Sequence, residues 1–294
     1  MKALIAGAGG QLGAALLEGA GPGIETVGLA RAELDIADEA AVREALLRER
    51  PDLVFNAAAY TAVDRAESET AEAFRVNRDG AANLARAARE VGARLIHVST
   101  DFVFDGERPH PWRPQDVPAP VNLYGASKLA GERAVLEEGG DALIVRTAWV
   151  YAHRGRNFLL TMLRLMADRE EVRVVSDQIG APTSAASLAR GLWGLARVGA
   201  KGVLHLTDAG CASWYDFACA IADQALDRGL LERSPSVTPI ASADWPTPAR
   251  RPAFSVLDCS EAWRRLGGPA PHWRSSLSET IAALARERMG ALSP

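Results

Sequence analysis

The chain has 294 residues, of which 48% are hydrophobic and 24% are charged, and its formal net charge is −4. This composition is that of an ordinary globular protein, and it provides no global positive field for nucleic acid or an anionic membrane. Three cysteines exclude a disulfide framework, and no apolar run approaches the ~20 residues of a membrane helix, so we expect a cytoplasmic protein.

The first half of the chain alternates short apolar runs with longer amphipathic stretches. We predict strands at residues 3–6, 25–29, 53–55, 94–98 and 142–145. We predict helices at residues 11–18, 38–47 (with Asp38 as the cap), 71–90 and 123–138. Strands that alternate with helices indicate βαβ units, and hence an α/β fold with a doubly wound parallel sheet.

After about residue 150 the pattern changes to helices separated by irregular chain. We predict helices at residues 157–167, 185–196, 214–227 and 277–289. Residues 107–120, with five prolines, and the proline-rich residues 234–252 are expected to be irregular. We therefore predict one domain over residues 1–150. Residues 151–294 mainly form a smaller domain, with some segments returning to the first.

A glycine-rich segment, Gly7 to Gly13, follows the first strand and opens the first helix. In dinucleotide sites such glycines allow a tight turn, close approach of the pyrophosphate and close helix packing, while the helix N-terminus faces the phosphates. A plain βα turn would use similar residues, but the strand before and the helix after favour a nucleotide site. We therefore expect residues 1–150 to be a Rossmann-type domain that binds NAD(P).

The end of the second predicted strand bears on the choice of cofactor. A carboxylate there would bind the adenosine ribose, but the strand ends in Leu29-Ala30-Arg31. Arg31 is either a contact to the 2′-phosphate of NADPH or a solvated surface residue. We therefore expect NADPH to bind at least as well as NADH. Asp35 and Ile36 would flank the adenine, and the small residues 56–59 either let the cofactor pass or simply start a helix.

A catalytic group is predicted from three residues. Thr100 ends the fourth strand, and Tyr124 and Lys128 stand four residues apart on one helix face. A phenol titrates near 10, and a neighbouring ammonium would lower that pKa. We expect Tyr124 to exchange a proton with a carbonyl oxygen that Thr100 orients, with Lys128 tuning the phenol and holding the cofactor ribose. A surface pair would show the same spacing, but the chain has only four tyrosines and three lysines.

The scarcity of lysine adds to this expectation. Of 33 basic residues, three are lysine and the other 30 are arginine, so Lys128 is expected where arginine will not serve. Asn77 either holds backbone or water behind Lys128 or is an ordinary polar helix residue. The five histidines are dispersed and no CxxC pair occurs, so we predict no metal site from spacing.

These stretches resemble the extended short-chain dehydrogenase/reductase family, and within it the dTDP-4-dehydrorhamnose reductases. The resemblance covers most of the chain and rests on residues 7–13, 34–36, 56–67, 99–106, 124–132, 146–151 and 177–183. It implies NAD(P)H-dependent reduction of the C4 ketone of dTDP-4-dehydro-L-rhamnose to dTDP-L-rhamnose, the last step of dTDP-rhamnose biosynthesis.

The resemblance also implies roles for single residues. Thr100 and Asp101 would touch the substrate, together with Tyr124 as proton donor. Trp149 would pack on the deoxysugar, unless it is a core residue. The dTDP moiety would lie near Asn157, Phe158, Gln178 and Arg251. The cofactor contacts would be Gly7, Gly10, Gln11, Leu12, Gly13, Arg31, Asp35, Ile36, Ala59, Tyr60, Thr61, Val98, Tyr124 and Lys128.

The expected partner is a small-molecule nucleotide sugar, and the chain would be a monomer or a homodimer. Some relatives use magnesium, bridged by carboxylates at a dimer contact, one of them just after the glycine loop. This chain has Ala14-Ala15 there, which leaves magnesium open. Two alternatives remain. One is a reductase of another nucleotide-linked 4-keto-6-deoxysugar. The other is a non-catalytic subunit resembling the methionine adenosyltransferase beta subunit, which loss of Tyr124 or Lys128 would favour.

Overall fold

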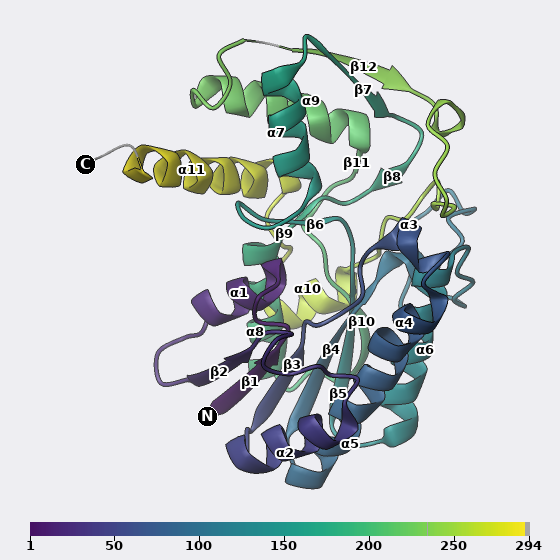
Figure 1. Cartoon of the computed structure of the whole chain (residues 1–294), viewed down its shortest axis with the longest axis vertical. Coiled ribbons are helices and arrows are strands. Elements are labelled where there is room, and N and C mark those ends of the chain that lie inside the picture. The colour runs from purple at the N-terminus through teal and green to yellow at the C-terminus, as the bar shows by residue number, and fades with distance from the viewer. Residues whose placement is uncertain (234, 292–294) are drawn as a thin grey trace.

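The structure is a computed structural model that describes residues 1–233 and 235–291. A parallel six-stranded sheet forms the centre of the lower body in Figure 1. The strand order is β10-β5-β4-β3-β1-β2, so the doubly wound sheet predicted from the sequence is confirmed. Chain order reverses between β1 and β3, which is where ligands bind in sheets of this kind. The strands are β1 (Lys2–Ala6), β2 (Glu25–Leu29), β3 (Leu53–Asn56), β4 (Arg94–Thr100), β5 (Ala142–Thr147) and β10 (Gly202–His205).

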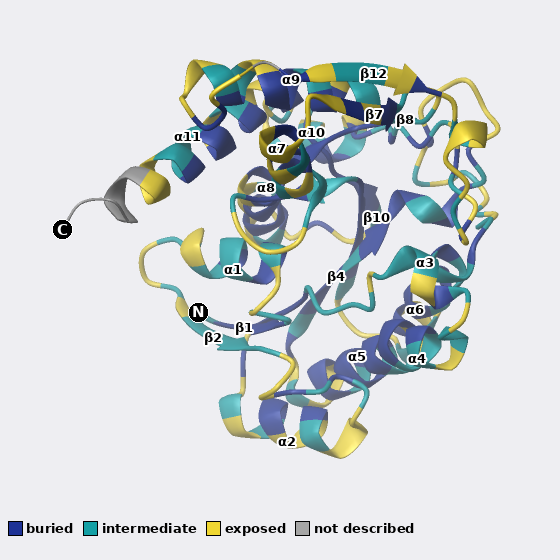
Figure 2. Ribbon diagram, turned by 45° about the horizontal axis from the view of Figure 1, so that its top comes forward, coloured by how far each residue is buried: buried dark blue, intermediate teal, exposed yellow. Residues whose placement is uncertain are grey.

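Helices cover both faces of the sheet because its strands alternate apolar side chains to each side. In β1, Ala3 and Ile5 join one buried cluster, whereas Leu4 and Ala6 join another. The first cluster is covered by α1 (Gln11–Glu18), α8 (Ala185–Arg197) and α10 (Ser260–Leu266). The second is covered by α2 (Glu39–Glu49), α5 (Gly80–Val91) and α6 (Leu123–Glu138). Figure 2 shows buried residues on inner strands such as β4, whereas the edge strand β2 is only partly buried.

The helical stretch predicted over residues 71–90 is confirmed, but it contains a π turn that was not predicted. The chain forms α3 (Val63–Ala66) and α4 (Thr70–Phe74), then a π turn (Arg75–Asp79), and only then α5. The π turn carries Asn77, whose side chain hydrogen-bonds the backbone of Tyr60. Such turns often mark functional sites.

A second body packs its own apolar cluster above the sheet (Figure 1). It contains α7 (Phe158–Asp168), α9 (Trp214–Asp227) and α11 (Trp273–Ala291), the last starting four residues before the predicted position. The prediction that residues 234–252 are irregular is wrong in part. They include β12 (Ser236–Ile240), which pairs with β7 (Glu171–Val175), and a 3-10 turn (Ser242–Asp244). β12 accepts Pro239 because this two-stranded ladder leaves one edge of β12 without a partner.

Short ladders lie between these larger elements. β6 (Val150–Tyr151) pairs with β9 (Thr183–Ser184), and β8 (Ile179–Gly180) pairs with β11 (Ala212–Ser213). After β4, a 3-10 turn (Asp101–Val103) leads into the proline-rich loop. Within the described part of the chain, no helix is both long and apolar enough to cross a bilayer.

Candidate active site

The glycine-rich loop between β1 and α1 needs glycine at its turn. Gly7 has φ +82°, and a Cβ on it would lie 2.6 Å from the backbone nitrogen of Ala58. A Cβ on Gly13 would collide with the Gly7 carbonyl, so α1 packs directly on the loop. Gly10, the N-cap residue before α1, provides no side-chain cap, which leaves N–H groups of the first helical turn free for an anion. The loop therefore fits a dinucleotide pyrophosphate.

Two residues of this loop have different surroundings. The Leu12 side chain is buried in the cluster under α1, so only its backbone can face a ligand. Gln11 accepts a hydrogen bond from Asn157 Nδ2 at 2.8 Å. Asn157 also caps α7, because its Oδ1 accepts from the Leu160 N–H at 3.0 Å. The structure thus places Asn157 between the glycine loop and the start of α7.

Tyr124, Thr100 and Asp101 come together at the end of β4. The Tyr124 phenol lies within hydrogen-bonding reach of the Thr100 hydroxyl. Thr100 Oγ1 donates to Asp101 Oδ1 at 3.0 Å and accepts from the Phe102 N–H at 3.2 Å. Burial raises the pKa of Asp101 to about 6, although hydroxyls of Ser255 and Thr100 oppose the shift.

The start of α6 brings Tyr124 to this position. Asn122 caps the helix by accepting from the Gly125 N–H at 2.7 Å, and its Nδ2 donates to the Arg250 carbonyl. Gly125 has no side chain, and a Cβ there would collide with the Phe102 carbonyl. Glycine therefore lets α6 press against the turn that follows Thr100.

The phenol remains protonated at neutral pH. Burial raises the pKa of Tyr124 to about 12, with the Thr100 hydroxyl opposing the shift and the Asp101 charge adding to it. The sequence-based expectation that Lys128 lowers this pKa is wrong for this structure, because Lys128 Nζ instead donates to the Val98 carbonyl at 2.7 Å. A neutral phenol is nevertheless the form that can give a proton to a ketone.

Lys128 is buried one turn along α6 from Tyr124, with 2% of its surface exposed. Burial lowers the pKa of its ammonium to about 8, and the charge of Glu132 opposes that shift. A partly desolvated ammonium at this position can hold a ribose hydroxyl and stabilise a phenolate.

Asn77 connects two parts of the site. Its Oδ1 accepts from the Tyr60 N–H at 2.8 Å, and its Nδ2 donates to the Tyr60 carbonyl and to Ser127 Oγ. Ser127 in turn donates to the Tyr124 carbonyl at 2.7 Å. A Cβ on Gly131 would collide with the Asn77 carbonyl, so α6 lies directly on the π turn. The side chain of Asn77 thus ties the segment after β3 to the helix that carries Tyr124.

Charged residues cluster where the adenosine end of a dinucleotide was predicted. Arg31 is largely exposed and pairs with Glu72 at 3.2 Å. Arg75 donates to both Glu72 and Asp35. Burial opposes ionisation of Asp35, but the Ala37 N–H and Arg75 outweigh it and lower the pKa of this carboxyl. Arg31 is therefore a surface guanidinium whose carboxylate partner, Glu72, is shared with Arg75.

The remaining predicted cofactor contacts differ in exposure. Ile36 is 3% exposed and packs against Gly80, so its side chain belongs to the core. Ala59 is half-buried and Thr61 is exposed, in the segment that follows β3. Tyr60 donates its hydroxyl to Glu69 at 2.7 Å.

Trp149 has an unusual conformation for a large residue. Its φ is +48°, and its ring stacks on Trp214 with the centroids 3.5 Å apart and the planes 3° apart. Phe158 packs on Trp214 at 4.6 Å. A Cβ on Gly180 would lie 2.6 Å from Trp149 Nε1. Non-glycine residues in this backbone region often occur at functional sites, which supports a role for Trp149 beyond core packing. No sequence pattern identified Trp214 as its stacking partner.

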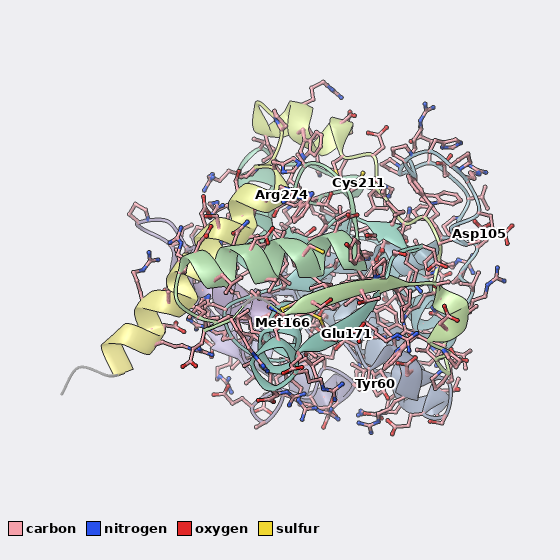
Figure 3. All side chains as sticks on the ribbon, turned by 90° about the horizontal axis from the view of Figure 1, so that it is seen from above. Tyr60, Asp105, Met166, Glu171, Cys211 and Arg274 are labelled. Carbon is pink, nitrogen blue, oxygen red and sulfur yellow. The ribbon has the colours of Figure 1, made fainter. Side chains whose placement is uncertain are left out.

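A groove of about 1340 Å³ runs over the second body. Its walls include Phe158, Trp214, Gln178 and Arg251. Asp105, from the loop after the 3-10 turn, and Glu171, from β7, also line it and are labelled in Figure 3. The four arginines that line the groove are Arg169, Arg173, Arg250 and Arg251. Four carboxylates also line the groove, those of Asp105, Glu107, Glu171 and Asp177, so its size fits an extended ligand while its charges balance.

Two residues predicted to hold the nucleotide are already engaged by protein groups. Arg251 makes a bidentate pair with Asp64, at 3.0 and 2.9 Å, and this pair lowers the pKa of Asp64. Gln178 Nε2 donates to Ser242 Oγ at 2.8 Å. Asp64 was missed as a functional partner, although it lies in the 56–67 motif.

The cleft beside the glycine loop bears on magnesium. Ala14 and Ala15 line it, together with Glu18 and Glu279. Glu18 pairs with Arg154 at 2.7 Å. Over residues 1–233 and 235–291, no group of three or more His, Cys, Asp or Glu side chains is placed to hold a metal ion. Ala14 and Ala15 supply no carboxylate after the glycine loop, and the question of magnesium stays open.

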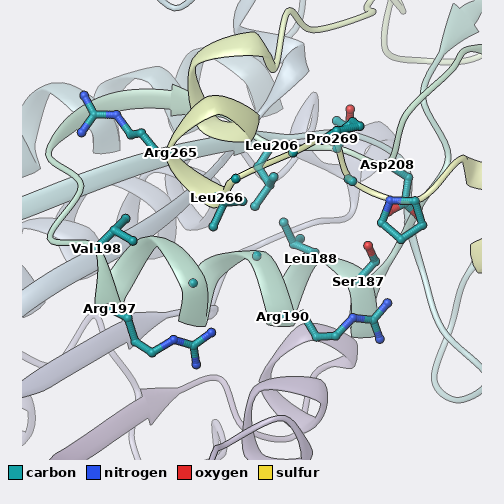
Figure 4. A pocket seen from close by; sticks show the side chains of 17 residues that line it. Ser187, Leu188, Arg190, Arg197, Val198, Leu206, Asp208, Arg265, Leu266 and Pro269 are labelled. Atoms are coloured by element: carbon teal, nitrogen blue, oxygen red, sulfur yellow. The ribbon is translucent and has the colours of Figure 1, made fainter.

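A separate cavity of about 520 Å³ lies between α8, α10 and residues 267–271. Figure 4 shows Leu188, Leu206 and Leu266 around it, with Asp208 at one end. None of the predicted site residues lines this cavity.

Known proteins match nearly the whole chain. Residues 1–286 match the family described as RmlD substrate binding domain. The dTDP-4-dehydrorhamnose reductase of Burkholderia thailandensis is 45% identical, over 93% of this chain and 96% of the relative. That of Mycobacterium tuberculosis is also 45% identical, over 96% and 93%. The structure of dTDP-4-dehydrorhamnose reductase from Bacillus anthracis in complex with NADP is similar, with a TM-score of 0.91, 37% identity and coverage of 96% and 99%.

Proposed function

The chain belongs to the RmlD substrate binding domain family, and we propose that it is an NADPH-dependent oxidoreductase that reduces the C4 ketone of dTDP-4-dehydro-L-rhamnose to dTDP-L-rhamnose. The observation that carries the proposal is the contact of Tyr124 with Thr100, with Lys128 one turn along the same helix. Relatives 45% identical over nearly the full chain bear the name of this reductase.

The geometry of the glycine-rich loop fits the binding of NADPH. Backbone groups from Gly10 to Gly13 would hold the pyrophosphate, and Lys128 would hold the nicotinamide ribose. Arg31 would meet the 2′-phosphate that distinguishes NADPH. When bound, NADPH supplies the hydride that reduces the C4 carbon.

The residues of the protein deliver a proton to the ketone and stabilise the charge that this transfer leaves on Tyr124. Tyr124 gives its phenolic proton to the C4 oxygen, so that the ketone gains one hydride and one proton and becomes an alcohol. If the Lys128 ammonium turned from the Val98 carbonyl to the phenolate, it would stabilise the negative charge left on Tyr124. The Thr100 hydroxyl, beside the phenol, would help to orient the C4 oxygen, and Thr100 and Asp101 would contact the sugar.

Substrate binding would use the second body. The Trp149 ring would present an apolar face to the deoxysugar, and the arginines of the groove would face the diphosphate. Gln178 and Arg251 line the same groove, but each would exchange a protein partner for the ligand. A cytoplasmic location and a monomeric or homodimeric state remain predictions.

An assay with several substrates tests this function. The purified chain is mixed with NADPH and, in separate reactions, with dTDP-4-dehydro-L-rhamnose and with GDP- or UDP-linked 4-keto-6-deoxysugars, and NADPH oxidation is followed. We expect the highest kcat/KM with the dTDP-linked L-sugar and a product that co-elutes with dTDP-L-rhamnose. Preference for another sugar would identify a sister reductase, and no oxidation with any of them would refute the enzymatic role.

A further inference from the structure

One ion pair is buried inside the sheet body. Arg146 of β5 donates to Glu132 of α6 through Nε at 2.9 Å and Nη2 at 2.7 Å. Their side chains are 4% and 3% exposed, and no other ion pair in the described part of the chain has both members so buried. Replacing such a pair by apolar residues is often neutral or stabilising, so stability alone does not account for it.

Glu132 lies on the catalytic face of α6. It is four residues after Lys128 and eight after Tyr124, so the three share one side of the helix. Ser99, which precedes Thr100 in β4, donates its hydroxyl to Glu132 Oε1. A single carboxylate therefore links the end of β4 to the helix that carries the proton donor.

Arg146 is itself fixed from several directions. Its Nη1 lies 3.3 Å from the Pro114 carbonyl and 3.4 Å from His205 Nε2, and its guanidinium sits over the Phe104 ring at 5.1 Å. Burial, together with the charge of Arg146, lowers the pKa of His205 to about 3, so His205 adds no charge at neutral pH. Arg146 is thus a rigid support for the Glu132 carboxylate.

We propose that Glu132, held by Arg146, is a positioning residue that sets Thr100 against Tyr124 and supplies the negative charge that offsets the Lys128 ammonium. The effect of this role on catalysis rests on the proposed function, whereas the contacts of Glu132 with Arg146 and Ser99 are independent of it.

The charges around Lys128 support this role. From its own helix, Glu132 opposes the effect of burial on the Lys128 pKa, and the neutral phenol of Tyr124 lies one turn away. From β4, His97 faces it as a neutral imidazole, because burial and Lys128 hold the His97 pKa well below its usual value. Removing the Glu132 charge would therefore leave the buried Lys128 ammonium without this opposing charge, while the Arg146 cation stays in place.

The chain offers a direct measurement because it has only three lysines, Lys2, Lys128 and Lys201. Protein carrying ¹³Cε-lysine gives three NMR signals whose pH titrations report each ammonium without substrate. In Glu132→Gln we expect the Lys128 midpoint to fall by roughly 0.5–1 unit, while the other two stay in place. The matched control is Asp208→Asn, which removes another buried carboxylate and should leave the Lys128 midpoint unchanged.

A second variant separates positioning from charge. Ser99→Ala removes one hydrogen bond to Glu132 and no charge, and it serves even if Glu132→Gln does not fold. We expect kcat to fall about tenfold, with the Lys128 midpoint and NADPH affinity unchanged.

Two results would overturn the inference: an unchanged Lys128 midpoint in Glu132→Gln, or wild-type kcat in Ser99→Ala. An inactive wild type would instead refute the proposed function, and the NMR titration would still decide the electrostatic role of Glu132.

Discussion

Gly180→Ala tests whether the position of Trp149 matters for the sugar. A Cβ at residue 180 would lie 2.6 Å from Trp149 Nε1 and 2.7 Å from Cζ2. The Trp149 ring has little freedom to retreat, because it is stacked on Trp214 at 3.5 Å and its backbone has φ +48°. Overpacking of this kind costs about 1–3 kcal/mol. If Trp149 contacts the deoxysugar, kcat/KM for the nucleotide sugar should fall by roughly 5- to 150-fold.

The assay compares three quantities in wild type and variant: kcat/KM for the nucleotide sugar, the dissociation constant of NADPH, and Tm. NADPH binding should be unchanged, because the glycine loop lies on another element. Gly268→Ala is the matched control, since a Cβ there meets nothing within 4 Å. Wild-type kcat/KM in Gly180→Ala, with a lowered Tm, would show that Trp149 is only a packing residue.

Three further predictions concern the cofactor, Lys128 and a buried histidine. Arg31→Ala should weaken NADPH roughly fivefold, less at high salt, and leave NADH unchanged; equal losses in parallel titrations would make Arg31 a plain surface residue. Lys128→Arg should fold but lose most activity, because a guanidinium is wider than the buried ammonium that donates to the Val98 carbonyl, and wild-type rates with a wild-type pH–rate profile would contradict this. His205, with its pKa lowered to about 3, stays neutral in the fold but binds a proton in the unfolded chain below about pH 6.5, so it removes stability as pH falls. Between roughly pH 6 and 3.5, the unfolding free energy of His205→Gln should therefore change with pH by about 1.4 kcal/mol per pH unit less than that of wild type. Urea melts at several pH values measure both slopes, and equal slopes for wild type and variant would show that His205 is protonated in the fold.

The features that the sequence predicted well are encoded locally. The glycine loop lies within seven residues, and Tyr124 and Lys128 lie within one helical turn. The five strands predicted in the first half are short apolar runs that need no distant information to be recognised. The close approach of Tyr124 to Thr100 follows from strand and helix ends meeting at one edge of the sheet.

The features that were missed depend on distant contacts. The π turn exists because Asn77 reaches Tyr60, 17 residues away, and fits against Gly131 of α6. The sixth strand, β10, is a four-residue run whose place is decided only by pairing with β5. β12 was hidden by Pro239, which a two-stranded ladder tolerates.

Local sequence patterns also did not predict which side chains contact each other. The expected lowering of the Tyr124 pKa failed because burial dominates and the Lys128 ammonium turns to the Val98 carbonyl. Arg251 was predicted to contact the ligand, but its partner Asp64, 187 residues away, was not predicted. No spacing rule connects such pairs.

The most direct test of the central claim is the turnover of Tyr124→Phe. NADPH oxidation is measured with saturating dTDP-4-dehydro-L-rhamnose for wild type and variant side by side, with NADPH affinity determined for both. If Tyr124 gives the proton to the C4 oxygen, kcat should fall by ~10²–10⁴-fold while NADPH affinity is retained. Near-normal kcat in Tyr124→Phe would contradict the account, because no other group has been assigned to supply that proton.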